Sequence, residues 1–181
     1  MHKNSLRLMS GLLDKYAPKE GLCVDVGSYD VNGTYRPLVE GRGLRYLGID
    51  IAAGPNVDVV VPDTDGNRTL HAWRWCLSPD PNNVDRPTPN IVISGQCLEH
   101  TKRPWVWIQH VMEFAEVGTV VILIAPAMWP HHRYPVDCWR IYPDGMRSLL
   151  EFAGLEVLDV GLSKIDSSHE DCWGVGRAGC H

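Results

Sequence analysis

Hydrophobic residues along this chain gather in short unbroken runs, separated by polar segments that contain glycine or proline. Such runs predict strands, because a strand buried on both faces is continuously apolar rather than alternating. Five of them cover residues 21–26, 44–49, 57–61, 90–94 and 118–125. Apolar side chains recur at helical spacing in four other stretches, which cover residues 6–16, 35–40, 104–115 and 143–153. The pattern therefore predicts alternating strands and helices.

The order of these elements predicts an α/β fold. Strands joined by helical or irregular crossovers favour a mostly parallel sheet with helices on both faces. The last two predicted strands, 155–160 and 172–175, have no helix between them, which predicts an antiparallel terminal hairpin. A sheet of seven strands is then expected, within a single domain that spans residues 1–181. A chain of this length can bury one core of ordinary size but not two.

Three segments lie outside this regular alternation. Residues 1–19 contain an amphipathic lead-in helix. Residues 62–89 form a long loop with five prolines and little periodicity, in which a short helix is expected over 72–77. A loop of that length is uncommon in a compact domain without a functional reason. Residues 126–142, rich in aromatic, histidine and charged side chains, are expected to form a lid after the fifth strand.

Charge and hydropathy limit the classes of partner that the sequence predicts. The formal net charge is −5, and the longest basic stretch is Thr101-Lys102-Arg103, so nucleic acid is disfavoured as a partner. No apolar run approaches the roughly 20 residues that span a bilayer, so no membrane partner is expected. The first residues are mixed and charged, unlike a signal peptide. A cytoplasmic protein is therefore expected.

Cysteine usage agrees with a reducing compartment. The six cysteines are scattered and include no Cys-x-x-Cys pair, which favours free thiols over disulfides. Cys172, Cys180 and His181 are potential zinc ligands, but their spacing matches no common zinc module.

The ends of the first two strands carry the clearest chemical signal. The first ends as Asp25-Val26-Gly27-Ser28, and the second ends in Asp50, about one helix later. This pairing is typical of adenosine sites in open α/β sheets. The glycine lets the backbone approach the ligand, and the second carboxylate accepts hydrogen bonds from ribose hydroxyls.

Together these motifs resemble the class I S-adenosylmethionine-dependent methyltransferases, most closely their small type 11 group, over about residues 20–177. The fourth strand with Glu99-His100 after it, and residues 140–149 followed by 153–157, also stand in the order of that family. The resemblance implies a Rossmann-like fold and S-adenosyl-L-methionine as the cofactor. The cofactor-binding residues that it implies, together with neighbours at the same sheet edge, are Asp25, Gly27, Ser28, Asp50, Ile51, Asp63, Gly95 and Gln96.

Within that set, the resemblance assigns Asp25, Gly27 and Ser28 to the methionine end of the cofactor, Asp50 to the ribose and Asp63 to the adenine amino group. From the residues alone, Asp25 can instead hold the glycine turn. The glycine run departs from the family pattern, because its second and third glycines are Tyr29 and Val31 and glycine returns only at Gly33. Asn32-Gly33 can supply a left-handed turn instead. The departure bears on how the methionine carboxylate is held, not on whether the site exists.

Two regions supply candidates for catalysis. His100 is the candidate general base or acceptor-orienting residue, since its pKa class suits proton transfer near neutrality. Its structural alternative is a helix N-terminal histidine bonded to Glu99. In the lid, Trp129, Tyr134 and Trp139 are expected as walls of an acceptor site, with His132, Asp137 and Arg140 as polar contacts.

The lid has alternatives of its own. It can be purely structural, with Asp137 paired to Arg133 or Arg140. A metal site from His131, His132 and Asp137 is disfavoured, because neighbouring histidines point apart in an extended chain, so no metal ion is expected.

The leading hypothesis is a cytosolic methyltransferase that acts on a small-molecule or sugar hydroxyl, since one short lid and no added module favour a compact acceptor over a folded macromolecule. A nicotinamide-dependent oxidoreductase is disfavoured because the first turn lacks a Gly-x-Gly-x-x-Gly array. A non-catalytic, methyltransferase-like binding or partner module is the third hypothesis, motivated by the altered glycine run. The sequence leaves the oligomeric state open.

Overall fold

A computed structural model describes residues 2–63 and 88–179. The described strands are β1 (Leu22–Val26), β2 (Arg45–Asp50), β3 (Val59–Val60), β4 (Ile91–Gly95), β5 (Val120–Met128), β6 (Leu155–Lys164) and β7 (Glu170–Ala178). The described helices are α1 (Lys3–Tyr16), α2 (Arg36–Glu40), α4 (Pro104–Met112) and α5 (Pro143–Phe152), with a 3₁₀ turn, η1, at Leu98–His100.

In the described part of the chain, the seven strands form one sheet in the order β3-β2-β1-β4-β5-β7-β6. Strands β1 to β5 pair in parallel, whereas β7 is antiparallel to both β5 and β6. The predicted mostly parallel sheet with an antiparallel terminal hairpin is therefore confirmed. The chain first builds outward from β1 to β3 and then crosses back to β4, so strand order reverses between β1 and β4.

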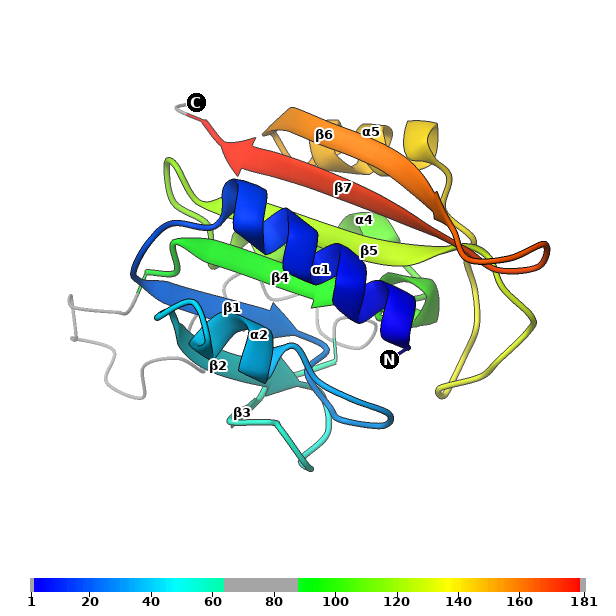
Figure 1. The fold of residues 1–181 in the computed structure, drawn as a ribbon, viewed down its shortest axis with the longest axis horizontal. Coiled ribbons are helices and arrows are strands. Elements are labelled where there is room, and N and C mark those ends of the chain that lie inside the picture. The colour runs from blue at the N-terminus through cyan, green and yellow to red at the C-terminus, as the bar shows by residue number, and fades with distance from the viewer. Residues whose placement is uncertain (1, 64–87, 180–181) are drawn as a thin grey trace.

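Helices cover both faces of the sheet (Figure 1). On one face, α1 and α2 pack Met9, Leu13 and Val39 against the sheet. On the other face, α4 and α5 pack side chains such as Ile108 and Leu150. Every residue of β1 and β4 is buried, which explains why both strands are almost continuously apolar. The few polar side chains in them form hydrogen bonds inside the protein.

Several elements end elsewhere than their apolar pattern predicts. Strand β5 continues to Met128, so the first three residues of the predicted lid 126–142 belong to the strand. Strands β6 and β7 pair from Leu155↔Ala178 to Lys164↔Glu170, which leaves only 165–169 as their connection. Backbone hydrogen bonds between two strands continue whatever the side chains are, so the apolar run underestimates the length of a paired strand.

Of the predicted loop 62–89, residues 64–87 lie outside the described residues, and so does the helix expected over 72–77. In the described ranges, no helix has the length and apolar character needed to cross a membrane.

Candidate functional site

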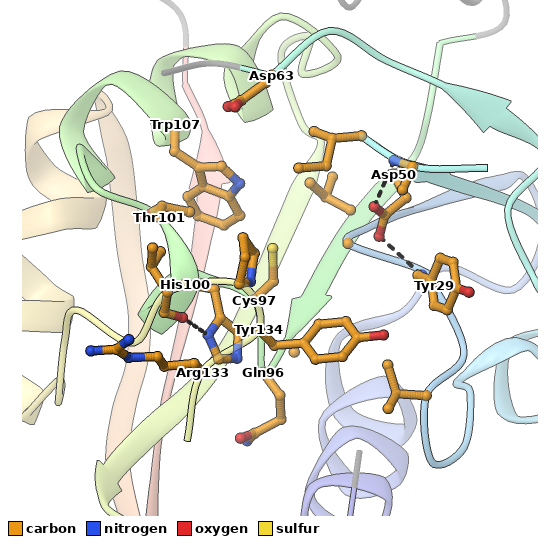
Figure 2. Close-up of a pocket in the computed structure, with 18 of the residues that line it drawn as sticks. Tyr29, Asp50, Asp63, Gln96, Cys97, His100, Thr101, Trp107, Arg133 and Tyr134 are labelled. Carbon is orange, nitrogen blue, oxygen red and sulfur yellow. Dashed lines mark hydrogen bonds between the residues drawn. The ribbon is translucent and has the colours of Figure 1, made fainter. Parts of the chain in front are cut away.

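A cavity of about 740 Å³ opens at the carboxyl ends of the parallel strands, beside the reversal between β1 and β4. Open α/β sheets bind their ligands at this position. Figure 2 shows Asp50 and Tyr29 on one side of the cavity and His100, Arg133 and Tyr134 on the other. We call the first the glycine side, formed by Gly27, Tyr29, Asp50, Ile51 and Asp63, and the second the histidine side, formed by His100, Trp129, His132 and Tyr134.

On the glycine side, the turn after β1 is shaped by glycine. Gly27 has φ +79°, and a Cβ at this position would lie 2.6 Å from the Cys97 sulfur. The Gly27 and Ser28 amides both donate to the Ile49 carbonyl, at 2.9 and 3.0 Å. These bonds hold the turn against the end of β2, where Gly27 lines the cavity.

The loop beyond this turn closes by the left-handed conformation that Asn32-Gly33 predicts. Gly33 has φ +125°, and its amide donates to the Asp30 carboxylate at 2.6 Å. Asp50, at the end of β2, accepts hydrogen bonds from the backbone amides of Tyr29 and Ala52, both at 3.1 Å (Figure 2). Asp50 therefore ties the glycine loop to β2.

Six of the eight predicted cofactor residues line the cavity, and Asp25 and Ser28 do not. The Asp25 carboxylate is 2% exposed and accepts a 2.5 Å hydrogen bond from the Tyr46 hydroxyl. Burial raises the pKa of Asp25 to about 7. Ser28 donates to the Asn56 carbonyl at 3.3 Å. Asp25 is thus bonded to a residue of β2 and Ser28 to the loop after β2, and neither lines the cavity.

The floor of the cavity is formed by Gly95 and Gln96, at the end of β4. A Cβ on Gly95 would lie 1.9 Å from the Tyr35 hydroxyl, so no other residue fits there without a rearrangement. Gln96 has φ +58°, and its side-chain amide donates to Asp171 at 3.1 Å. Asp171 is fully buried at the start of β7 and also accepts from Asn4 at 2.7 Å. Sequence reasoning missed Asp171 because the last strand that it predicts, 172–175, begins one residue later.

On the histidine side, two imidazoles are oriented by backbone carbonyls. His100 Nδ1 lies 2.6 Å from the Val136 oxygen, and His132 Nδ1 lies 3.1 Å from the Pro130 oxygen. A carbonyl oxygen only accepts, so each Nδ1 carries the proton and each Nε2 has a free lone pair. The two rings meet edge to face, with centroids 5.0 Å apart.

Both Nε2 atoms approach Glu99. The Glu99 Oε1 atom lies 3.7 Å from His100 Nε2 and 4.0 Å from His132 Nε2. The Glu99 side chain is fully buried, and neither of its oxygens has a hydrogen-bond partner among the described residues. Burial raises the pKa of Glu99 to about 8. The structural alternative for His100, a direct bond to Glu99, is not formed at 3.7 Å.

Asp137 and Arg140 do not line the cavity; they brace the loop that carries His132. Arg140 donates to both Asp137 oxygens, at 2.6 and 2.7 Å, and this pairing holds the pKa of Asp137 well below its usual range. Asp137 in turn accepts from the His132 amide at 2.7 Å. The Asp137–Arg140 ion pair is one of the two pairings named for a purely structural lid.

The expected walls of the acceptor site are only partly assembled. Trp129 and Tyr134 line the cavity. Trp139 does not line it, and its indole N–H donates to the Thr101 carbonyl at 2.7 Å.

Comparison with known proteins identifies the architecture. No family model and no curated protein sequence match the chain. Solved structures match at low identity. A 1,6-didemethyltoxoflavin-N1-methyltransferase from Burkholderia thailandensis, with S-adenosylhomocysteine bound, has a TM-score of 0.70 and 11% identity, covering 97% of this chain and 79% of that chain. A SAM-dependent methyltransferase from Archaeoglobus fulgidus has a TM-score of 0.58 and 16% identity, covering 96% and 94%. The fold is that of class I S-adenosylmethionine-dependent methyltransferases.

This methyltransferase fold recurs among proteins with different chemistry. Magnesium protoporphyrin IX methyltransferase from Synechocystis matches with a TM-score of 0.57 and 15% identity, covering 98% of this chain and 80% of that chain. The [4+2]-cyclase SpnF matches with a TM-score of 0.67 and 12% identity, covering 97% and 82%. A fold does not determine a reaction, so the activity has to be inferred from the side chains in the cavity.

Proposed function

We propose that this protein is an S-adenosylmethionine-dependent methyltransferase whose acceptor is a small molecule or sugar with a hydroxyl group. One observation carries the proposal: a single cavity at the strand reversal joins the glycine side to the histidine side. The methyltransferase fold supports the cofactor, and the cavity chemistry supports the acceptor class.

The glycine side fits the cofactor in three respects. Gly27 lines the cavity with backbone atoms alone. Each Asp50 oxygen accepts one backbone amide and keeps a further lone pair for a ribose hydroxyl. Ile51 lines the cavity with half of its surface exposed, which offers an apolar contact for adenine. When bound, S-adenosylmethionine supplies a methyl group already activated by the sulfonium.

The protein's own contribution is to align the acceptor and to exclude competing geometries. Trp129 and Tyr134 offer aromatic walls on the histidine side, and His132 offers a polar contact. A cavity of about 740 Å³ lies within the range of about 300–1,000 Å³ typical of small-molecule sites, which supports a compact acceptor. Burial lowers the pKa of His100 below its usual value, so its imidazole is neutral near pH 7 and its Nε2 can accept a proton.

Calorimetric titration with S-adenosylhomocysteine, with NAD in parallel, tests the cofactor assignment. One-to-one binding of S-adenosylhomocysteine alone is expected. Asp50→Ala should weaken that binding by about 1–3 kcal/mol, the scale of lost hydrogen bonds to a charged group. Glu151→Ala, on the exposed last turn of α5, is the control and should leave the affinity unchanged. No binding by the folded wild-type protein would overturn the proposal.

The acceptor class needs a separate experiment. Transfer of labelled methyl groups to a panel of hydroxylated small molecules and sugars, with amine acceptors as controls, should give oxygen-methylated products that mass spectrometry identifies. Methylation of amines alone would refute the hydroxyl assignment. The altered glycine run favours one second candidate, a non-catalytic methyltransferase-like module. Cofactor binding without turnover on any acceptor, together with a stable protein partner, would favour that module.

A further inference from the structure

The histidine side brings together three side chains whose free donor atoms converge. One carboxylate oxygen of Glu99 and one nitrogen each of His100 and His132 lie within 4.8 Å of one another. Glu99 and His100 come from the turn η1 after β4, whereas His132 comes from the loop after β5. Because β4 and β5 are adjacent parallel strands, their carboxyl ends place these two segments side by side.

Both imidazoles are oriented for coordination. In each ring, Nδ1 donates to a backbone carbonyl, that of Val136 for His100 and that of Pro130 for His132. Metal-binding histidines typically anchor the far ring nitrogen in this way, which fixes the tautomer and aims the other lone pair at the ion. The Asp137–Arg140 pair adds a further support, since Asp137 accepts from the His132 amide.

Glu99 supplies an independent observation. Its side chain is completely buried, and no described residue donates a hydrogen bond to either oxygen. Burial of an unpaired carboxyl group is costly, and folded proteins pair such groups or place them on metal ions. The Nε2 atoms of the two imidazoles lie 3.7 and 4.0 Å from its Oε1, too far for a hydrogen bond. The Glu99 carboxyl and the two imidazoles thus converge with no hydrogen bond between them, and a cation bound at that point would satisfy all three.

We propose that Glu99, His100 and His132 bind a divalent first-row transition-metal ion, with Zn²⁺ as the best-suited probe. Two imidazoles and one carboxylate form a donor set that suits such ions better than Ca²⁺ or Mg²⁺, which prefer oxygen ligands alone. Ligand atoms about 2.0–2.1 Å from a tetrahedral ion lie about 3.3 Å apart. The two separations from Glu99, 3.7 and 4.0 Å, therefore need only a small contraction, and the two imidazole nitrogens lie within 4.8 Å of each other. His100 and His132 line the cavity, so the remaining coordination position faces it.

This set differs from the one that the sequence offered. His131 is exposed and does not line the cavity, and both Asp137 oxygens are engaged by Arg140. Neighbouring histidines do point apart, as the sequence analysis expects, so only His132 reaches the cluster. The other two ligands, Glu99 and His100, come from η1. His100 lies 32 positions before His132 in the sequence.

The role of the ion rests on the proposed function. An acceptor hydroxyl held at the open position would lose its proton to water more readily, because a Lewis acid lowers the pKa of an oxygen that it binds. The oxygen then forms a bond to the methyl carbon. The carbon–sulfur bond breaks at the same time, and its electron pair stays on the sulfur, which becomes a neutral thioether. His100 Nε2 would then act as a ligand and not as the general base.

Metal binding is testable without turnover. The full chain is freed of metal with a chelator, and Zn²⁺ alone is titrated in a calorimeter. One equivalent should bind and raise the thermal midpoint. Co²⁺ in place of Zn²⁺ should give visible d–d bands without a thiolate charge-transfer band, which distinguishes this cluster from cysteine ligands.

Three variants locate the site. His132→Ala and Glu99→Gln should each weaken Zn²⁺ binding by at least about 100-fold, since changes around the ligands alone cost about 10–100-fold. His131→Ala, the adjacent histidine outside the cluster, should bind as the wild type does. His132→Ala alters a partly exposed loop residue, so it tests the site even where Glu99→Gln fails to fold. Absence of binding to the folded wild type would overturn the proposal, and so would unchanged affinity in His132→Ala.

The same samples are titrated with S-adenosylhomocysteine, which separates the two proposals. Zn²⁺ binding without S-adenosylhomocysteine binding would leave the metal site standing and refute the cofactor assignment. The reverse result would refute the metal site alone.

Discussion

The two sides of the cavity are built by different means. On the glycine side, the backbone itself forms the surface: the Gly27 turn is held by the Ile49 carbonyl, and Asp50 is tied to two amides of the chain nearby. On the histidine side, the surface consists of side chains from two segments, and one of these is a loop that the Asp137–Arg140 pair braces.

Residues on the two sides should therefore contribute differently to the stability of the fold. Strand ends are fixed by the sheet, so the glycine side cannot change without cost to the fold. The loop after β5 is held in part by the turn η1, where the Cys138 amide donates to the Glu99 carbonyl at 2.8 Å. Variants on the glycine side should therefore alter the free energy of unfolding as well as cofactor binding, whereas variants on the histidine side should alter acceptor or metal binding.

The largest effect is expected from Gly27→Ala. The new Cβ would meet the Cys97 sulfur at 2.6 Å in a backbone conformation of φ +79°. Left-handed strain and overpacking together should lower the free energy of unfolding by about 2–5 kcal/mol. Urea denaturation measures the loss.

A double variant tests the cause of that loss. Gly27→Ala combined with Cys97→Gly removes the steric conflict, so its destabilisation should be smaller than the sum of the two single variants. Strict additivity would show that the Cys97 contact does not matter.

A smaller effect, dependent on pH, is expected from Asp25→Asn. Burial raises the pKa of Asp25 from 3.8 to about 7, so the protonated carboxyl stabilises the fold at low pH. That contribution is lost as the pH rises through about 7. Between about pH 5 and pH 8 the wild type should lose about 2–3 kcal/mol of stability from this group, and Asp25→Asn should not.

Denaturant midpoints across this pH range provide the measurement. Asp144→Asn, on the exposed first turn of α5, is the matched control and should follow the wild-type profile. An Asp25→Asn profile that also parallels the wild type would assign the pH dependence to another group.

A further loss of stability is expected from Arg140→Ala, because the Asp137 side chain is only 1% exposed and its carboxylate would lose its charged partner while it stays buried. Its loss frees Asp137 and loosens the loop that holds His132. Affinity for S-adenosylhomocysteine should stay unchanged, whereas kcat should fall by up to about 100-fold through misplacement of the acceptor.

Arg140→Lys keeps the charge without the two parallel hydrogen bonds, and it should restore only part of kcat. Arg147→Ala, on the exposed surface of α5, serves as the control. Weakened cofactor binding in Arg140→Ala would contradict the division between the two sides.

The glycine side could be predicted from the sequence because its signals are local. An apolar run that ends in Asp25-Val26-Gly27 indicates a strand followed by a turn, and Asp50 ends the next strand in the same way. The order of the parallel strands then places these ends together. Which side chains face the cavity was less predictable: Asp25 lies on the far side of its strand, bonded to Tyr46.

The histidine side could not be predicted as a cluster, because its parts come together only through the sheet. The sequence offers Glu99-His100 as one motif and His131-His132 as another. Their convergence depends on the pairing of β4 with β5 and on the path of the loop after β5. Asp171 was missed for a related reason, since backbone pairing extends β7 beyond its apolar run and turns a surface residue into a buried one.

The tryptophans in the cavity give the protein its own optical reporters. Trp107, which lies beside Thr101 in Figure 2, and Trp129 both line it. Trp107→Phe and Trp129→Phe each remove one of the seven tryptophans, so the part of a ligand-induced fluorescence change that a variant loses is assigned to that residue. Stopped-flow fluorescence of the two variants can then follow the order in which cofactor and acceptor arrive, without any added label.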